Sequence, residues 1–130
     1  MPGFDLPLLL LVENEYFTRD MVEHALRDGG FDLAIATSGE EAFSLLDEPR
    51  SFVGVVTDVD LGGSADGWAV ARHARSAASD TSIVYMTGGS AGQWLIQGVP
   101  LSVLVTKPFA EAQIVSAITT LLNTPTLPAA

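Results

Sequence analysis

The stretch that decides the fold class is residues 8–30, LLLLVENEYFTRDMVEHALRDGG. Residues 8–12 form an unbroken apolar run of strand length, and from Phe17 to Leu26 the apolar side chains recur at helical spacing. Gly29 and Gly30 then end the helical pattern. This stretch therefore predicts a strand followed directly by a helix.

The same alternation continues along the chain. A second strand is predicted at residues 31–36, and a second helix after Ser38, because Glu41 follows Ser38 at the spacing of a helix-capping pair. The other expected elements are strands at 52–57, 83–87 and 101–105 and helices at 68–78, 90–97 and 114–122. Short apolar strands that alternate with helices predict an α/β fold, with a doubly wound sheet of five parallel strands and five helices on both faces.

Length and composition indicate one folded domain. The chain has 130 residues, of which 48% are hydrophobic and 17% are charged. This length suits a single domain, and the composition is too apolar for a disordered chain. We expect the domain to span residues 1–123, followed by a disordered tail at residues 124–130 that contains Pro125 and Pro128.

The charge balance excludes several classes of partner. Sixteen Asp and Glu residues against six Lys and Arg residues give a formal net charge of −10. Such a protein is repelled by nucleic-acid phosphates and by anionic membranes. The apolar run at residues 6–12 is too short to cross a bilayer, and no basic residue precedes Arg19 to begin a signal peptide, so a cytoplasmic location is expected.

Residues that ligate soft metals are scarce. The chain has no cysteine, which excludes disulfides and zinc–thiolate sites and fits a reducing compartment. The two histidines, His24 and His73, are too few for a histidine-rich metal site, and we expect both to be solvated.

Polar side chains follow four of the five predicted strands. They are Glu13, Asn14 and Glu15 after the first strand, Asp58 and Asp60 after the third, Thr87 at the end of the fourth, and Thr106 and Lys107 after the fifth. Ligands of open parallel sheets bind at the carboxyl ends of the strands, so we expect these side chains to converge on one crevice.

The residue types at these positions suit phosphoryl transfer. Carboxylate and carbonyl oxygens are the ligands that Mg²⁺ prefers, and an aspartate can act as a nucleophile that carries an acyl phosphate. A threonine hydroxyl and a lysine ammonium can then stabilise the phosphoryl oxygens. Lys107 is the only lysine in the chain. Taken singly, however, Glu13 and Glu15 are explained as partners of a helix dipole, and Asp60 as a turn cap.

Over residues 8–122 the sequence resembles the receiver domains of bacterial response regulators. Residues 12–15 resemble the family's acidic pocket, and residues 56–61 resemble its phosphoacceptor segment, which makes Asp58 the acceptor. Asp66-Gly67 matches the end of the following loop, and residues 85–88 match the switch-threonine segment around Thr87. Residues 106–109 resemble the family's Lys-Pro-Phe motif, in which the Lys-Pro bond is typically cis. The resemblance implies a flavodoxin-like sheet with the strand order 2-1-3-4-5.

The resemblance also implies a function. The chain would be a single-domain response regulator, with no effector domain, that accepts a phosphoryl group on Asp58 from a histidine kinase or a histidine phosphotransfer protein, assisted by Thr87 and Lys107. The implied Mg²⁺ ligands are Glu13, Asn14, Asp58 and the backbone carbonyl of Asp60. The output would be altered binding of a downstream protein by the face of the fourth helix, fifth strand and fifth helix. The chain would take part in its own phosphoryl transfer and dephosphorylation without being an enzyme.

Three positions depart from the family pattern. Asn14 replaces an acidic Mg²⁺ ligand, which predicts weaker metal binding, and Leu104 stands where the family has a switch aromatic. The loop from Asp58 to Asp66 has one extra residue and contains Gly62 and Gly63, which predicts a more mobile loop.

Two alternative functions stay open at the level of sequence. Asn14 and Leu104 are compatible with a pseudo-receiver that binds partners without phosphorylation. Asp58-Val59-Asp60 also has the D-x-D pattern of haloacid-dehalogenase-type phosphatases, in which the second aspartate is a general acid. That pattern should follow the first strand of the sheet rather than the third, so the phosphatase is the less favoured reading.

Overall fold

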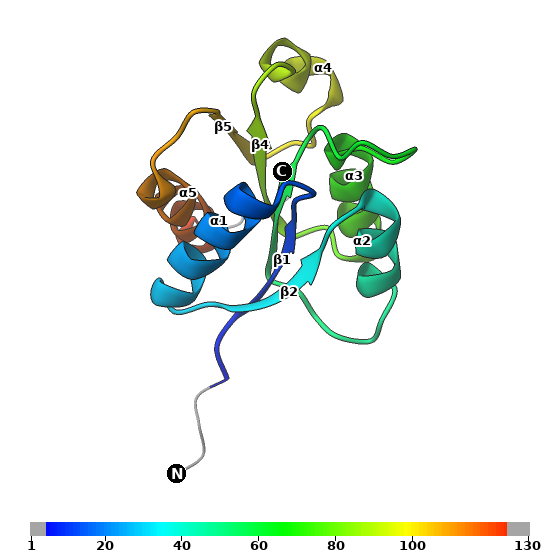
Figure 1. Cartoon of the computed structure of the whole chain (residues 1–130). Helices are drawn as coiled ribbons and strands as arrows, with labels where there is room; N and C mark the ends of the chain where they lie inside the picture. The colour runs from blue at the N-terminus through cyan, green and yellow to red at the C-terminus, as the bar shows by residue number, and fades with distance from the viewer. Residues whose placement is uncertain (1–4, 125–130) are drawn as a thin grey trace.

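The computed structural model describes residues 5–124 and has the predicted sheet (Figure 1). Its strands are β1 (Leu8–Val12), β2 (Asp32–Ala36), β3 (Gly54–Asp58), β4 (Ser82–Thr87) and β5 (Ser102–Thr106). All neighbouring strands are parallel, in the order β2-β1-β3-β4-β5. The expected doubly wound architecture and strand order are therefore confirmed.

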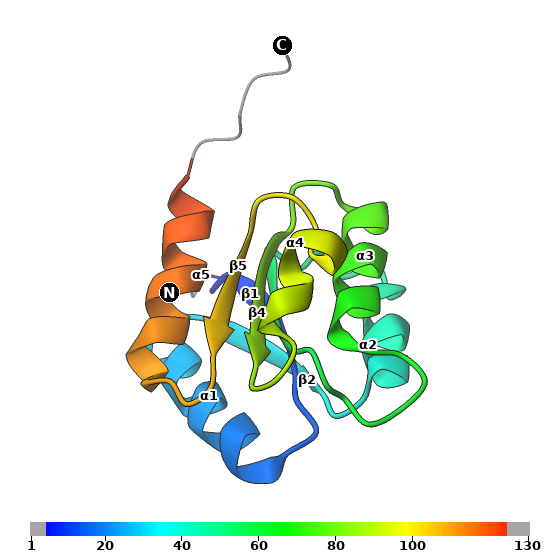
Figure 2. The ribbon, with the colours of Figure 1, turned by 90° about the horizontal axis from the view of Figure 1, so that it is seen from above.

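Helices cover both faces of the sheet, as Figures 1 and 2 show. On one face lie α1 (Tyr16–Asp28) and α5 (Glu111–Asn123). On the other face lie α2 (Gly39–Leu46) and α3 (Gly67–Ala77), with the short α4 (Trp94–Gln97) beyond them. This two-sided coverage explains why the strands are unbroken apolar runs rather than alternating patterns.

Successive strand side chains fill two separate cores. Leu10 and Val55 pack with α2 and α3, whereas Leu9 and Val56, their neighbours along the strands, pack with α1 and α5. The alternation follows from the two-residue period of a strand. Every residue of β3 is buried, including its last residue, Asp58.

Side-chain caps fix where the helices begin. Glu15 accepts hydrogen bonds from the backbone N–H groups of Phe17 (2.8 Å) and Thr18 (2.9 Å) at the start of α1. Ser38 accepts from the N–H of Glu41 (3.0 Å) at the start of α2. The Glu41 carboxylate accepts from the N–H of Thr37 (2.6 Å) and not from that of Ser38, so only half of the predicted capping pair forms.

The structure differs from the sequence-based elements in detail. The helix expected at 90–97 is a 3₁₀ turn at Ala91–Gln93 followed by one α-helical turn, because glycines flank it and only Trp94 packs inward. The other predicted elements are present with bounds shifted by a few residues. The tail expected at 124–130 lies, beyond residue 124, outside the described residues.

Two further expectations concern solvation and membranes. His24 is exposed, as expected. His73 is not simply solvated, because its ring stacks on Phe43 at 4.7 Å between centroids and its Nε2 lies 2.8 Å from Asp47 Oδ1.

Within residues 5–124 no helix has the length and apolar character needed to span a membrane.

Candidate functional site

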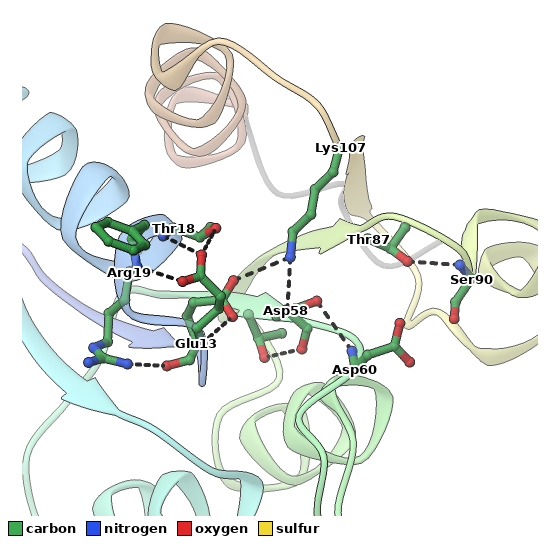
Figure 3. Close-up of polar contacts among 11 residues, drawn as sticks. Glu13, Thr18, Arg19, Asp58, Asp60, Thr87, Ser90 and Lys107 are labelled. Atoms are coloured by element: carbon green, nitrogen blue, oxygen red, sulfur yellow. Dashed lines mark hydrogen bonds and ion pairs between the residues drawn. The ribbon is translucent and has the colours of Figure 1, made fainter.

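Sheet register brings the predicted site residues to one edge. Asp58 is the last residue of β3 and is opposite Met86 on β4, and Thr87, at the end of β4, is opposite Thr106 on β5. Glu13 follows directly after β1, the other neighbour of β3. The polar residues of four chain segments therefore lie together at one edge of the sheet, as Figure 3 shows.

The centre of the site is an ammonium group between two buried carboxylates (Figure 3). Lys107 Nζ lies 3.0 Å from Asp58 Oδ2 and 3.5 Å from Glu13 Oε1. Glu13 is fully buried and Asp58 is 4% exposed. The remaining oxygens are satisfied by backbone donors: Glu13 Oε2 accepts from Glu15 N–H (3.0 Å) and Asp58 Oδ1 accepts from Asp60 N–H (3.2 Å). Burial of two carboxylates is tolerable here because each has a cationic partner and a hydrogen bond.

Burial and charge shift the protonation of this group. Burial raises the pKa of Glu13 to about 7, and the nearby Asp58 carboxylate adds to the rise, while Glu15 N–H and Lys107 oppose it. Burial lowers the pKa of Lys107, but its hydrogen bond to Asp58 and the charges of Asp58 and Glu13 outweigh burial and raise it. Lys107 therefore stays charged, whereas Glu13 titrates near neutrality.

Thr87 lies at the same edge of the sheet, but its hydroxyl is hydrogen-bonded to Ser90 rather than to Asp58 or Lys107. Its side chain is fully buried, and its Oγ1 accepts a hydrogen bond from Ser90 N–H (2.9 Å). Lys107 N–H donates to the Thr87 carbonyl (2.8 Å), which ties the ends of β4 and β5 together. Because the Thr87 hydroxyl acts as an acceptor here, its own proton is left for an oxygen bound beside Asp58.

The expected metal ligands fit a hard divalent cation. Across residues 5–124, no group of three or more His, Cys, Asp or Glu side chains is arranged to hold a metal ion. The implied ligand set instead combines the carboxylates of Glu13 and Asp58 with the carboxamide of Asn14 and the carbonyl of Asp60. Asn14 and Asp60 are exposed, so both are open to a hydrated ion. An all-oxygen set that leaves room for water matches the preference of Mg²⁺.

The two glutamates that follow β1 have different roles in the structure. Glu15 is exposed and serves as the α1 cap, and its hydrogen bonds from Phe17 and Thr18 lower the pKa of its carboxyl. Glu13 is instead drawn inward toward Lys107. Glu15 therefore has the helix-cap role, whereas Glu13 combines a hydrogen bond from Glu15 N–H with its contact to Lys107.

Two residues that support Asp58 were not assigned a role from sequence. A Cβ added to Gly67 would overlap the Asp58 carbonyl oxygen and lie 2.8 Å from Val59 Cα, so only glycine lets α3 start against the end of β3. Thr57 Oγ1 donates to the same Asp58 carbonyl (2.9 Å). The sequence analysis noted Gly67 as part of the Asp66-Gly67 motif. The physical reason for a glycine there is the close approach to the backbone of residues 58 and 59, which the sequence cannot show.

The loop after Asp58 is anchored rather than free. Leu61 and Ala65 are buried in the core on the α2–α3 side, and Gly62 has a φ of 76°, a conformation that favours glycine. The expectation of a more mobile loop was based on its extra residue and its two glycines. The buried side chains before and after the two glycines restrain the loop in a way that the loop's length and glycine content do not reveal.

The last two motif positions lie on β5 and just after it. The Lys107-Pro108 peptide bond is cis, as the resemblance implies. Leu104 is half-buried and lies opposite Tyr85 on β4. Tyr85 is fully buried, and its hydroxyl accepts from Val99 N–H (3.1 Å), so an aromatic side chain on β4 contacts the segment before β5.

Comparison with known proteins agrees with this fold. The sequence model of the response regulator receiver domain matches residues 9–119. The chain is similar to the crystal structure of a response regulator receiver protein from Sinorhizobium medicae, with 36% identity, a TM-score of 0.90 and coverage of 93% of this chain and 98% of that one.

A second solved structure shares the fold. It is the receiver domain of the sensor histidine kinase PA1611 from Pseudomonas aeruginosa, with a magnesium ion in its active-site cleft, and it matches at 19% identity and a TM-score of 0.76, covering 91% of this chain and 98% of that one. Among curated proteins, the transcriptional regulatory protein CusR of Escherichia coli is 28% identical over 117 residues, which cover 88% of this chain and 51% of CusR. The chain thus spans about half the length of the curated relatives that it matches.

Proposed function

We propose a function from the premise that this chain belongs to the family of response regulator receiver domains. In this proposal Asp58 accepts a phosphoryl group from a phosphohistidine of a histidine kinase or a histidine phosphotransfer protein. The observation that carries the proposal is the contact of a nearly buried Asp58 with the chain's only lysine, at the end of β3. A nucleophile and its charge-stabilising donor are thereby already in place.

The proposed transfer is a single displacement at phosphorus. A carboxylate oxygen of Asp58 forms the new P–O bond while the P–N bond to the donor histidine breaks, and the leaving imidazole nitrogen takes up a proton. Lys107, 3.0 Å from Asp58 Oδ2, balances the negative charge that the phosphoryl group brings. Thr87 donates its hydroxyl proton, which its contact with Ser90 N–H leaves free, to a phosphoryl oxygen.

Mg²⁺ is the proposed cofactor. It would be held by Glu13, Asn14, Asp58 and the carbonyl of Asp60, and when bound it would supply positive charge that offsets the negative charge of the phosphoryl oxygens. The role of the chain is that of an acceptor that is modified once per cycle. The phosphatase reading loses support because the side chain of Asp60 is exposed and contacts Asp58 only through its backbone N–H.

We further propose that the α4–β5–α5 face binds the downstream partner. No residue from 88 to 106 is charged, in a chain whose net charge is −10. Leu95 and Ile96 on α4 and Leu101 before β5 are exposed by 90%, 82% and 66%. Between β5 and α5 runs an open groove whose lining residues are all uncharged, and β5 is an edge strand. Such a face is suited to a protein partner that shields apolar side chains from water.

The proposal is tested by the intact mass of the purified protein after incubation with a small-molecule phosphodonor and Mg²⁺. We expect one added phosphoryl group in the parent, none without Mg²⁺ and none in Asp58→Ala. Asp60→Ala is the matched control, since it removes a neighbouring carboxylate but keeps the backbone carbonyl that is the proposed ligand. Its acceptance of the phosphoryl group should persist.

The opposite result would favour the pseudo-receiver. If the folded parent gains no phosphoryl group even at high Mg²⁺, then Asn14 has removed the metal-dependent chemistry. In that case Asp58→Ala should bind partners as the parent does. Partner binding that requires both the phosphodonor and Asp58 would exclude the pseudo-receiver.

A further inference from the structure

The loop between β3 and α3 is closed at its two ends. At one end Asp60 N–H donates to Asp58 Oδ1 (3.2 Å), and at the other Gly67 N–H donates to the carbonyl of Val59 (2.8 Å). Both ends are thus fixed on the last residues of β3 and the residue that follows. The position of the loop's middle, residues 62–65, depends on other contacts.

Those contacts come from the first turn of α2. Ser64 Oγ donates to Glu40 Oε2, and this hydrogen bond is the largest cause that lowers the pKa of the Glu40 carboxyl, with the nearby backbone N–H groups of Ala65 and Ser64 contributing. A Cβ added to Gly63 would lie 3.1 Å from Glu40 Oε1. A Cβ added to Gly39 would lie 2.6 Å from Ala65 Cβ, so the helix start and the loop are in direct contact.

The other side of the same loop faces the expected metal ligands. A Cβ added to Gly62 would lie 3.5 Å from Asn14 Nδ2, so the loop lies between Glu40 of α2 and the Asn14 side chain. Asp60, whose carbonyl is the other implied ligand from this region, begins the loop. Asp60 is held by its hydrogen bond to Asp58, so the position of the loop's middle affects where the Asn14 side chain lies relative to Asp60.

We propose that Glu40, acting through Ser64, is a positioning residue that holds the β3–α3 loop so that the Asp60 carbonyl and the Asn14 carboxamide are presented to Mg²⁺ together. The inference rests on the proposed function, because it requires Mg²⁺ at that site. Its physical basis is entropic. A loop with two glycines loses much conformational freedom when it is ordered, and a loop already held by α2 bears less of that cost on binding the ion.

The test is a calorimetric titration of the full chain with Mg²⁺ alone. We expect Ser64→Ala and Glu40→Ala to bind Mg²⁺ about three- to ten-fold more weakly, which is the range for loss of one or two hydrogen bonds. Ser64→Thr keeps the hydroxyl and should retain the parent affinity. Glu41→Ala is the matched control, because Glu41 lies in the same helical turn but contacts Thr37 and not the loop.

These variants separate positioning from simpler effects. Ser64→Ala changes no charge, so weaker binding in it is not a general electrostatic effect. A Ser64→Ala affinity equal to that of the parent, or an equal loss in Glu41→Ala, would overturn the proposal. A folded parent that binds no Mg²⁺ would overturn it as well. A parent that binds Mg²⁺ but accepts no phosphoryl group would contradict the proposed function while leaving the role of Glu40 decided by the titration.

Discussion

The two halves of the sheet edge differ sharply in how they use charge. In the inner half, at the ends of β1 and β3, the carboxylates of Glu13 and Asp58 are buried and share Lys107. In the outer half, from the end of β4 through α4 to β5, no residue from 88 to 106 is charged, and large apolar side chains are exposed. Buried charge and exposed apolar surface thus occupy neighbouring parts of one edge.

The difference shows where residues depend on one another. A buried carboxylate is tolerated only with partners, so Lys107 is coupled to Asp58 and Glu13, which lie 49 and 94 positions away in sequence. The exposed side chains of α4 have no such coupling. We therefore expect substitutions in the inner half to cost much stability, and substitutions on the outer surface to cost little.

The largest loss should come from Gly67→Ala, which breaks the backbone contact that supports Asp58. The new Cβ meets backbone atoms of residues 58 and 59 that have no room to move, so we expect a loss of about 3 kcal/mol or more in the free energy of unfolding. Gly92→Ala is the control, since a Cβ there has no atom within 4 Å. Urea denaturation measures both. Equal stability of the two variants would show that the start of α3 is not tightly packed.

Removal of the shared cation is the next largest change. Lys107→Met leaves Glu13 and Asp58 side by side without a counter-charge, and we expect a loss of roughly 2–3 kcal/mol near neutral pH. Arg27→Met, which breaks the surface ion pairs of Arg27 with Glu23 and Asp32, should cost under about 1 kcal/mol. Similar losses in the two variants, measured by thermal and urea unfolding, would contradict the contrast between buried and exposed charge.

The raised pKa of Glu13 predicts a specific pH dependence. The Glu13 pKa is about 7 in the folded protein against 4.5 unfolded, so the folded state holds the proton more tightly and loses stability as pH rises through that range. Glu13→Gln should reduce the difference in unfolding free energy between about pH 5 and about pH 8 by on the order of 2 kcal/mol in EDTA.

Glu15→Gln is the control for that measurement. The pKa of Glu15 is lowered, so its contribution is lost only as the solution is acidified below the ordinary glutamate range. The pH dependence above that range should therefore be the same as in the parent. A Glu13→Gln variant with the parent's pH profile would mean that Glu13 is ionised throughout.

A substitution of Tyr85, at the boundary between the inner and outer halves of the sheet edge, tests what holds the segment before β5 in place. Tyr85→Phe removes the hydroxyl that accepts from Val99 N–H, and we expect a loss of about 1 kcal/mol. Tyr16→Phe removes a hydroxyl from an exposed ring and should leave stability unchanged. If Tyr85→Phe is also neutral in chemical denaturation, the segment before β5 is held by packing alone.

The smallest effect is expected on the outer surface. Leu95→Ser and Ile96→Ser replace side chains exposed by 90% and 82%, so each should change the free energy of unfolding by less than about 0.5 kcal/mol. The same variants should weaken capture of a downstream partner. A stability loss of about 2 kcal/mol would instead place α4 within the folded core and remove the distinction between the halves.

Much of the fold follows from local patterns. The apolar run at residues 8–12 and the helical spacing up to Leu26 predicted β1 and α1 correctly. The segment at 90–97 was less well predicted, since its length depends on how Trp94 packs and where Gly98 lets the chain turn away. Local propensity sets whether a helix is possible, and packing sets how much of it forms.

The site was predictable in part for the same reason. Asp58, Thr87 and Lys107 each end a strand, and strand ends of a parallel sheet meet at one edge. The residues by themselves did not separate Glu13 from Glu15, because both follow β1; the family resemblance named Glu13, and the turn decides that its side chain points inward. The contact of Glu40 with Ser64 was equally hidden, since no pattern links α2 to that loop.

The sequence by itself thus determined the order of the elements, the parallel sheet and the chemical types of the groups at its edge. Tertiary structure alone decided that Glu13 is buried against Lys107, that Gly67 admits no side chain, and that α2 holds the β3–α3 loop. The physical reason is the separation along the sequence of the residues that interact. Periodicity and capping depend on residues within a few positions of one another, whereas burial, ion pairing and close backbone contact depend on segments that only the folded sheet brings together.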